Sequence, residues 1–503
     1  MQLATLYTRA LNGINAAEVT VEVHLSNGLP AFSIVGLPEA AVRESKDRVR
    51  AAIINSGFEF PARKITVNLA PADLPKDGGR YDLPIALGIL AATGQIDKTL
   101  LDRYEFHGEL ALSGLLREVT GSLPVALAAQ QHDKKLIMPV KSAKQAALIE
   151  HAEIYAAENL LSVCQHLQGL AQLPFAETAN EQDFVNTLLD MSDVRGQHHT
   201  RRALEIAAAG RHNMLMIGPP GTGKSMLASR LPGILPPMST QQALESASIN
   251  SISHQGFDIR QWKKRPFRSP HHTASGVALV GGGSKPSPGE ISLAHQGVLF
   301  LDELTEFDRH TLDVLREPME TGSITISRAA RQADFPARFQ LIAAMNPCPQ
   351  GYSCDGKTLC RCTPQQQLKH RNRISAPFLD RIDIHIEVLR IEQQVLDNNA
   401  PQGETSEQIR QRVYSAFKHQ QKRGPHFNAE LSVKEVENFC LLQEKEKLLL
   451  EKAMDRLKLS ARAYHRILKL ARTIADIEDS LNIEMPHLTE AISYRSLDRF
   501  INN

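Results

Sequence analysis

The chain has 503 residues and carries 57 Lys and Arg side chains against 56 Asp and Glu side chains, a formal net charge of +1. This balance excludes attraction of nucleic acid by overall charge, so a nucleic-acid partner would need a local basic surface or a ring that concentrates charge. The length predicts two to four domains, and without an apolar run of about eighteen residues no membrane association is expected.

The amino-terminal residues lack the basic region, apolar core and small-residue cleavage site of a signal peptide. We therefore expect a cytoplasmic protein. Residues 1–170 alternate β-rich and helical stretches. Val19–His24 and Lys64–Asn68 alternate as strands do, whereas Glu39–Asn55 carries an apolar stripe at helical spacing. An α+β domain is predicted.

The turn Pro75–Gly78, followed by a helical stretch and then Gly108–Gly114, resembles the protease domain of the Lon family, which has the ribosomal-protein-S5-like fold. The resemblance implies a serine nucleophile after the turn and an activating lysine further on. Here Gly79–Asp82 replaces the serine motif and Thr120–Ala126 contains no lysine. We expect no peptidase activity, because a serine without that lysine is not an activated nucleophile. The domain is then a DNA-contacting or ring-stabilising platform, or a passive oligomerisation scaffold.

A polar, aperiodic stretch at 171–189 predicts a linker, and 190–397 predicts an ATPase core. Within it, the apolar run Met214–Ile217 enters a glycine-rich turn that opens a helix, the setting of a phosphate-binding loop. The loop comprises Gly218, Pro219, Pro220, Gly221, Thr222, Gly223, Lys224 and Ser225. Lys224 is placed to reach the terminal phosphates of ATP, and the Ser225 hydroxyl to bind Mg²⁺.

Two further apolar strands end in polar residues. Val298–Leu301 ends in Asp302 and Glu303, which predicts one carboxylate for Mg²⁺ and one to orient or deprotonate the attacking water. The second strand ends in Asn346, whose amide would contact the water and the γ-phosphate. Arg381, after a predicted helix, fits an arginine finger delivered from a neighbouring subunit, or an ordinary salt bridge with Asp380 or Asp383.

Basic residues cluster in two places. The segment from Gln261 to Ser287 is interpreted as a mobile cationic loop. Its aromatic side chains, Trp262 and Phe267, either stack on bases or pack in the protein core. A second basic helix follows at Gln365–Arg373. The candidate contacts to DNA phosphates are Lys263, Lys264, Arg265, Arg268, Lys369, Arg371 and Arg373. The alternative is that these side chains form a solvated face or salt bridges at a subunit interface.

A cysteine cluster and a helical carboxyl-terminal region complete the chain. Four cysteines lie within fifteen residues and predict a Zn²⁺ site: Cys348, Cys354, Cys360 and Cys362. The alternative is that these thiols are free or redox-active. Residues 398–503 predict an all-α lid. Arg462 lies in the first turn of a predicted lid helix, where it would sense the γ-phosphate of ATP. Arg466 is the second candidate for this role, and the alternative is that Arg462 is an ordinary surface arginine.

Taken together, the order of phosphate loop, Asp-Glu strand, Asn strand and arginine segment resembles AAA+ P-loop ATPases. Four stretches resemble one family within this superfamily: Arg265–Thr273, Pro288–Glu303, Phe335–Phe339 and Met345–Cys348. On this resemblance the chain is identified as a member of the ComM/YifB family of magnesium-chelatase-like ATPases. Gln350 departs from the family's frequent Cys-Pro-Cys, which leaves the zinc ligands open.

The family resemblance implies a hexameric, ATP-driven DNA helicase that promotes branch migration in homologous recombination during natural transformation. Its implied cofactors are ATP and Mg²⁺, and its implied partners are single-stranded and branched DNA, further copies of the chain and proteins of a recombinase pathway. The alternative is a chelatase-type ATPase that remodels a partner protein.

Overall fold

The computed structural model describes residues 2–177, 189–283, 286–328, 331–351, 362–390, 403–457, 459–495 and 497. The chain divides into two compact units. The first contains residues 1–185 and the stretch Ala247–Trp262, and the second contains Asn186–Ser246 and Lys263–Asn503. Helix α9 (Thr240–Ser251) begins in the second unit and ends in the first. The stretch 247–262, which comes from within the predicted ATPase core, therefore packs with the amino-terminal unit.

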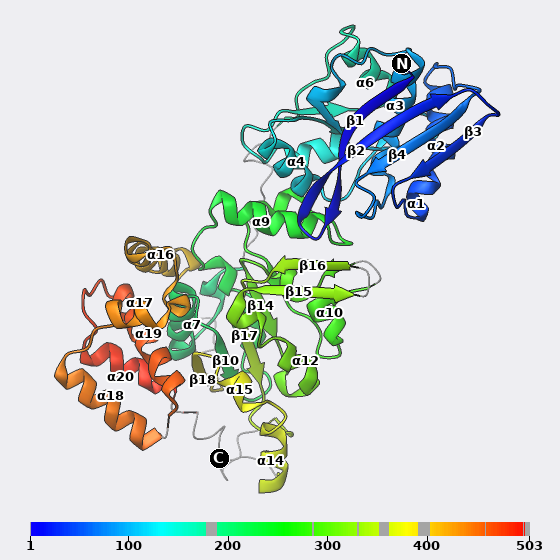
Figure 1. Ribbon diagram of the computed structural model, residues 1–503. Coiled ribbons are helices and arrows are strands. Elements are labelled where there is room, and N and C mark those ends of the chain that lie inside the picture. Colours follow the sequence, from blue (N-terminus) through cyan, green and yellow to red (C-terminus); the bar gives the residue numbers. More distant parts are fainter. Residues whose placement is uncertain are drawn as a thin grey trace. The chain divides into compact units, whose positions relative to one another are not determined.

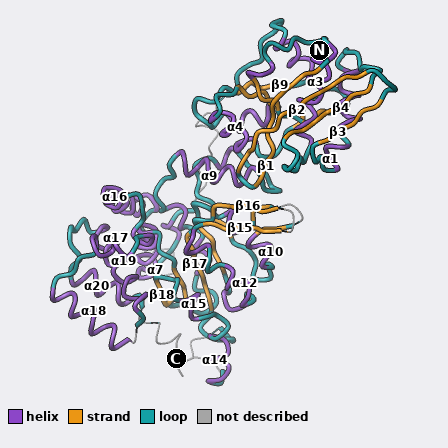
Figure 2. Tube along the Cα trace, viewed as in Figure 1, coloured by secondary structure: helices purple, strands orange, loops and turns teal. Residues whose placement is uncertain are grey.

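The first unit is built on a seven-stranded sheet in the order β3-β4-β2-β1-β5-β8-β9 (Figures 1 and 2). Its strands are β1 (Leu3–Asn12), β2 (Asn15–Ser26), β3 (Ala31–Val35), β4 (Lys64–Ala70), β5 (Tyr104–Phe106), β8 (Lys135–Pro139) and β9 (Ile154–Ala157), with a small separate pair, β6 (Glu109–Leu110) and β7 (Leu116–Arg117). Its helices are α1 (Ala40–Arg43), α2 (Ser45–Asn55), α3 (Asp82–Thr93), α4 (Ser122–Gln131), α5 (Val140–Ala146) and α6 (Leu160–Leu167).

The core of this unit follows from the sequence pattern. Alternate residues of β2 from Val19 to Leu25 are buried, as expected for a strand with one face on a core. Helix α3 is apolar all round and lies against β1 and β2, so it is buried along nearly its whole length. The predicted strands at 19–24 and 64–68 and the predicted helical stretch at 39–55 are confirmed.

The second unit is built on a parallel five-stranded sheet in the order β11-β14-β17-β10-β18. These strands are β11 (Phe267–Arg268), β14 (Val298–Leu301), β17 (Gln340–Met345), β10 (Met214–Ile217) and β18 (Ile384–Glu387). The strands β10, β14 and β17 are buried along their whole length, which explains why their sequences are apolar throughout except for Gln340. Two small hairpins pair β12 (Gly281–Gly282) with β13 (Ser287–Pro288), and β15 (Ser323–Arg328) with β16 (Arg331–Pro336).

Helices surround this sheet and then form a helical region that we call the lid. Around the sheet lie α7 (His198–Gly210), α8 (Lys224–Ala228), α10 (Gly276–Val280), α11 (Glu290–Leu293), α12 (Arg309–Val314), α13 (Pro318–Thr321), α14 (Pro364–Arg371) and α15 (Ala376–Leu379). The lid contains α16 (Ser406–Arg423), α17 (Val433–Phe439), α18 (Glu444–Leu457), α19 (Ala461–Ile477) and α20 (Met485–Ser493) (Figure 1). Apolar side chains of α16 and α19 join those of α7 and the sheet in one core, so the lid is packed onto the ATPase fold.

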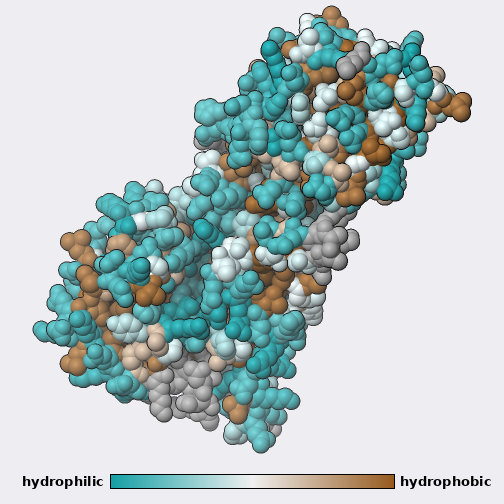
Figure 3. Space-filling view, viewed as in Figure 1, coloured by the Kyte–Doolittle hydropathy of each residue, from teal (hydrophilic) through white to brown (hydrophobic). Residues whose placement is uncertain are grey.

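Most of the visible surface is polar, but hydrophobic residues interrupt it over the lid (Figure 3). Large apolar side chains exposed in the lid include Leu441, Leu448, Leu481 and Met485. Among the residues that the structure covers, every helix is too short or too polar to span a bilayer.

Candidate functional site

The phosphate loop has the predicted setting. Buried strand β10 ends at Ile217, the loop follows, and α8 begins at Lys224. Gly221 and Gly223 have positive φ angles of 78° and 86°, which glycine adopts without steric cost. At Gly218 a side chain does not fit, because a Cβ atom would approach the Val388 carbonyl oxygen to 2.4 Å. The glycines are thus required by the path of the loop.

Lys224 is held inside this loop. Its Nζ atom donates to the carbonyl oxygens of Gly218 and Pro219 at 2.6 and 2.9 Å, and lies 3.3 Å from Oδ1 of Asn346. Burial lowers the pKa of Lys224, while the nearby carboxylates of Asp302 and Glu303 act in the opposite direction. The predicted lysine and the predicted amide therefore meet, although they are far apart in the sequence.

The carboxylates at the end of β14 complete the same site. Ser225 Oγ donates to Oδ2 of Asp302 at 2.5 Å, so a hydroxyl and a carboxylate converge at one point. Such oxygen donors suit Mg²⁺, a hard cation. Glu303 follows in a left-handed backbone conformation with φ 51°, an uncommon geometry that concentrates at functional positions. Asn346, after β17, lines the same cavity of about 380 Å³ as Lys224, Ser225, Asp302 and Glu303.

Arg381 lies near the amino ends of the sheet strands, whereas the phosphate loop lies at their carboxyl ends. Its backbone carbonyl accepts from the side chain of Asn213, the residue that precedes β10, whereas the phosphate loop follows β10. The strand between them covers roughly 13 Å at about 3.3 Å per residue. The Arg381 guanidinium pairs with Glu320 at 2.5 Å and donates to the Pro377 carbonyl at 2.6 Å. The alternative partners named from the sequence, Asp380 and Asp383, are not the ones that it contacts.

The two lid arginines differ sharply. Arg462 is exposed, whereas Arg466 forms an ion pair with Asp383 at the amino end of β18. Asp383 also lies 3.4 Å from Nδ1 of the buried His212. Burial alone would raise the pKa of Asp383, but the charges and hydrogen bonds of Arg466 and His212 outweigh it and hold this pKa well below its usual range.

The first basic segment, interpreted from the sequence as a mobile loop, includes short regular elements. It contains strand β11, which pairs with β14 at the edge of the sheet. Arg265 donates to the carbonyls of Pro236 and Gln296 at 2.7 Å, and burial, with nearby Arg211, lowers its pKa to about 9. Arg268 forms a two-pronged ion pair with Glu290 at 2.6 and 2.7 Å.

The aromatic residues of this segment serve packing. Trp262 is buried, with 9% of its surface exposed, and the ring of Phe267 stacks on that of Phe300 at 6.0 Å. Both follow the core alternative rather than base stacking. Lys263 is exposed and Lys264 half-buried. Of the four basic residues proposed in this segment, the two arginines are thus committed to bonds within the chain.

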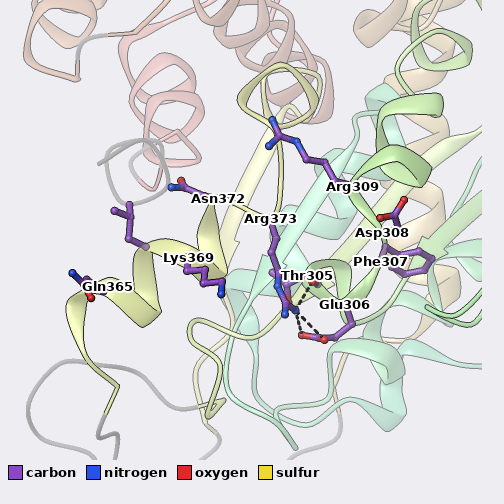
Figure 4. A pocket seen from close by; sticks show the side chains of 10 residues that line it. Thr305, Glu306, Phe307, Asp308, Arg309, Gln365, Lys369, Asn372 and Arg373 are labelled. Atoms are coloured by element: carbon purple, nitrogen blue, oxygen red, sulfur yellow. Dashed lines mark hydrogen bonds and ion pairs between the residues drawn. The ribbon is translucent and has the colours of Figure 1, made fainter.

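The second basic group borders a groove of about 710 Å³ between α14 and the segment that follows Glu303 (Figure 4). Lys369 is exposed on its wall, whereas Arg373 donates to Glu306 at 2.9 and 3.0 Å and to the Thr305 carbonyl at 3.0 Å. Arg371 is half-buried. His370, which the sequence did not single out as functional, reaches the Asn346 carbonyl at 3.1 Å, so α14 contacts a residue that lines the phosphate-loop cavity.

Two of the four cysteines, Cys354 and Cys360, lie outside the described residues. Cys348 is buried and Cys362 half-buried. In the described part of the chain, no group of three or more His, Cys, Asp or Glu side chains could hold a metal ion. The zinc hypothesis therefore gains no support here.

In the amino-terminal unit, the two segments compared with Lon proteases do meet. Arg80 Nη2 lies 3.4 Å from Thr120 Oγ1, and the Arg80 side chain is buried. A buried arginine thus stands at the end of the turn where the resemblance implies a nucleophilic serine. Nearby, Arg9 and Glu105 form a buried ion pair at 2.6 Å.

Besides His370, sequence reasoning missed His272, which contacts a residue of the same cavity. His272 Nδ1 lies 3.3 Å from Oε2 of Glu303. No local pattern links His272 to a glutamate thirty-one residues further along the chain. The pairing of β11 with β14 brings the two segments together.

Comparison with known proteins agrees with this architecture. Three family models match in succession: subunit ChlI of Mg-chelatase over residues 21–142, magnesium chelatase subunit ChlI over 190–396, and the ChlI carboxyl-terminal model over 403–495.

Individual proteins also match, two of them over the full length of the chain. Competence protein ComM of Haemophilus influenzae is 52% identical over 505 residues, covering 100% of this chain and 99% of that protein. YifB of Escherichia coli is 51% identical over 503 residues, covering 100% and 98%. The magnesium-chelatase 38 kDa subunit of Cereibacter sphaeroides is 26% identical over 178 residues, covering 31% of this chain and 52% of the subunit. The chain therefore belongs to the ComM/YifB family, whose members combine domains of the magnesium-chelatase AAA+ type.

Proposed function

We propose that this protein is an ATP-driven DNA motor, a helicase that promotes branch migration in homologous recombination during natural transformation. The observation that carries the ATPase half is the meeting of Lys224, Ser225, Asp302, Glu303 and Asn346 around one cavity. The DNA half is supported by the full-length identity to a protein named for competence.

Each side chain of the cavity has a distinct task. Lys224 binds the β- and γ-phosphates of ATP, and Ser225 with Asp302 holds Mg²⁺, which when bound neutralises phosphate charge. Glu303 orients the attacking water and accepts its proton, while Asn346 contacts the water and the γ-phosphate. Hydrolysis then depends mainly on positioning and charge, as in other phosphoryl transfers.

The arginines favour a ring of identical subunits. Arg381 and Arg466 lie toward the amino ends of the sheet strands, so we assign Arg381 to a neighbouring subunit's phosphates and not to its own. Arg462 is the better γ-phosphate sensor, because Arg466 is already paired with Asp383. Exposed apolar side chains over the lid suit a subunit contact. We propose a hexamer.

DNA contacts are assigned to the basic side chains that remain accessible. Lys263 and Lys369 are exposed, with Lys264 and Arg371 half-buried beside them. Contacts of this kind bind phosphates without reading sequence, which suits a motor that moves on single-stranded and branched DNA with proteins of a recombinase pathway.

The test is ATP hydrolysis by the full chain with and without a four-way DNA junction, with strand exchange followed in the same reaction. Wild type is compared with Glu303→Gln, which retains the size of the side chain but not its basicity. Junction-stimulated hydrolysis with strand exchange, both lost in the variant, is expected. Hydrolysis that no DNA accelerates would contradict the proposal.

The alternative is an ATPase that remodels a partner protein. The match to a magnesium-chelatase subunit over the ATPase core favours it. It predicts hydrolysis that responds to a protein partner and is indifferent to DNA in the same assay.

A further inference from the structure

Two buried polar side chains of the first unit lack the partners that burial demands. Arg80 and Tyr81, in the short turn that precedes α3, are 7% and 1% exposed. The Nη1 atom of Arg80 and the hydroxyl of Tyr81 have no hydrogen-bond partner in the described part of the chain. An unpaired buried donor costs free energy, and an unpaired buried charge costs far more. A ligand that accepts hydrogen bonds from both groups would remove these costs.

The charge of Arg80 distinguishes it from Arg9, which is also buried in this unit. Arg9 donates to both carboxylate oxygens of Glu105 at 2.6 and 2.7 Å, so its charge is neutralised. Arg80 donates through Nη2 to Thr120 Oγ1 at 3.4 Å, and no carboxylate of the described residues forms an ion pair with it. Burial lowers the pKa of Arg80, although the charge of Asp77 acts in the opposite direction. A water molecule would satisfy the N–H group but would leave this cation without a counter-charge.

The amino end of helix α4 adds further donors. Its first residue, Ser122, follows Thr120 by two positions, so the hydrogen bond from Arg80 places the guanidinium beside this end of the helix. No side chain caps α4, and the first N–H groups of a helix have no partner within it. These groups carry a partial positive charge that favours an anion. The donors of Arg80, Tyr81 and α4 therefore call for the same kind of ligand.

The turn before Arg80 and the residue that it contacts both border free space. Thr120 is exposed, and a Cβ atom on Gly78 would meet nothing within 4 Å. A guanidinium fork matches the geometry of a phosphate. We propose that Arg80, Tyr81, Thr120 and the amino end of α4 bind a phosphate group, either as free phosphate or as the terminal phosphate of a larger molecule. Because Arg80 and Tyr81 lie below the surface, a phosphodiester flanked by two sugars is excluded.

The test is urea unfolding of the full chain in about 10 mM phosphate and in chloride of equal ionic strength. Trp262, the single tryptophan, is buried in the first unit, so its fluorescence reports the unfolding of that unit. The background protein and every variant carry Lys224→Ala, which removes the lysine of the phosphate loop from the comparison. A site with a Kd of about 1 mM should lower the unfolding equilibrium constant of the background protein about tenfold in phosphate.

Three variants locate this effect. Arg80→Met removes the buried charge, so it should unfold no more readily than the background protein in chloride, and phosphate should not stabilise it. Tyr81→Phe removes an unpaired hydroxyl and should also be at least as stable in chloride, with the phosphate effect reduced to about threefold. Arg103→Met, at an exposed arginine of the same unit, is the matched control and should retain the full effect.

An equal phosphate effect in the background protein and in Arg80→Met would be the general stabilisation of folded proteins by this salt and would overturn the inference. No effect in the background protein would also overturn it. If Arg80→Met does not fold, an undiminished effect in Tyr81→Phe overturns it instead. Glycerol phosphate at the same concentration separates the two sources of the ligand: stabilisation equal to that by inorganic phosphate assigns the site to terminal phosphate groups, and its absence assigns the site to the free anion.

Discussion

Arg466 and Asp383 form an ion pair that joins lid helix α19 to the amino end of β18, the strand beside the phosphate-loop strand. Asp383 is buried and also accepts from the backbone amide of Asn213 at 3.1 Å. The pair therefore ties the lid to two neighbouring strands of the ATPase sheet.

Arg466→Ala should destabilise the protein by about 3 kcal/mol, because it leaves a buried carboxylate uncompensated. Since the pKa of Asp383 is lower when folded than when unfolded, its pairing stabilises the protein above about pH 4 and the stability is lost as the pH falls further. The wild-type advantage in urea unfolding should thus shrink in acid. The control is Arg462→Ala, an exposed change expected to cost less than about 0.5 kcal/mol; equal losses in both variants would contradict the assignment.

The placement of Arg381 predicts complementation between two inactive variants. Lys224→Ala cannot bind phosphate but retains Arg381, whereas Arg381→Ala retains a complete cavity. Each alone should lose at least about a hundredfold in ATP hydrolysis. Mixed subunits should regain part of it, because the first variant supplies its arginine to the site of the second. The measurement is hydrolysis at a fixed total concentration over a series of mixing ratios; activity no higher than the average of the two variants would show that Arg381 acts within its own chain or only in packing.

The residues that line the phosphate-loop cavity could be predicted from the sequence because each belongs to a local pattern. An apolar run followed by polar residues identifies a strand end, and strand ends of a parallel sheet meet at one edge. In this way Lys224, Asp302 and Asn346 were predicted together without knowledge of the strand order. The helical lid was predicted for the same reason, since its apolar periodicity is local.

What the sequence did not reveal depends on contacts between distant segments. Arg265 and Arg268 read as accessible charge, because nothing near them in the chain announces Glu290 or the carbonyl oxygens that they bind. The commitment of Arg466 to Asp383 and the approach of His272 to Glu303 likewise require the folded sheet. Charged residues are the least predictable from local pattern, since a solvated face and a paired network have the same composition.

Near β11, substitution of the exposed Lys263 should affect DNA binding, whereas substitution of the ion-paired Arg268 should affect stability. Lys263→Ala removes an exposed charge, so it should weaken binding of a single-stranded oligonucleotide and reduce the salt dependence of log Kd by about one. Arg268→Lys retains the charge but loses the two-pronged geometry with Glu290, and should cost about 1 kcal/mol of stability with the salt dependence unchanged. Fluorescence anisotropy across a salt series and urea unfolding give the two readouts. A reduced salt slope in Arg268→Lys would restore Arg268 as a DNA contact.

The amino-terminal unit contains a carboxyl group with an opposite pH response. Burial raises the pKa of Asp82 to about 6, despite its hydrogen bonds from Arg48. Because the unfolded chain releases this proton near pH 4 and the folded unit retains it to about pH 6, stability is lost as the pH rises through that window, by on the order of 3 kcal/mol.

In Asp82→Asn nothing titrates at this position, so its stability should fall less than that of wild type between pH 4 and pH 7. Urea unfolding followed by a probe in the first unit, at half-unit pH intervals, measures the difference. Asp97→Asn, at an exposed position whose pKa is instead lowered by hydrogen bonds around Thr99, is the control and should retain the wild-type fall. Parallel profiles for wild type and Asp82→Asn would mean that Asp82 is already ionised in the folded unit throughout this range.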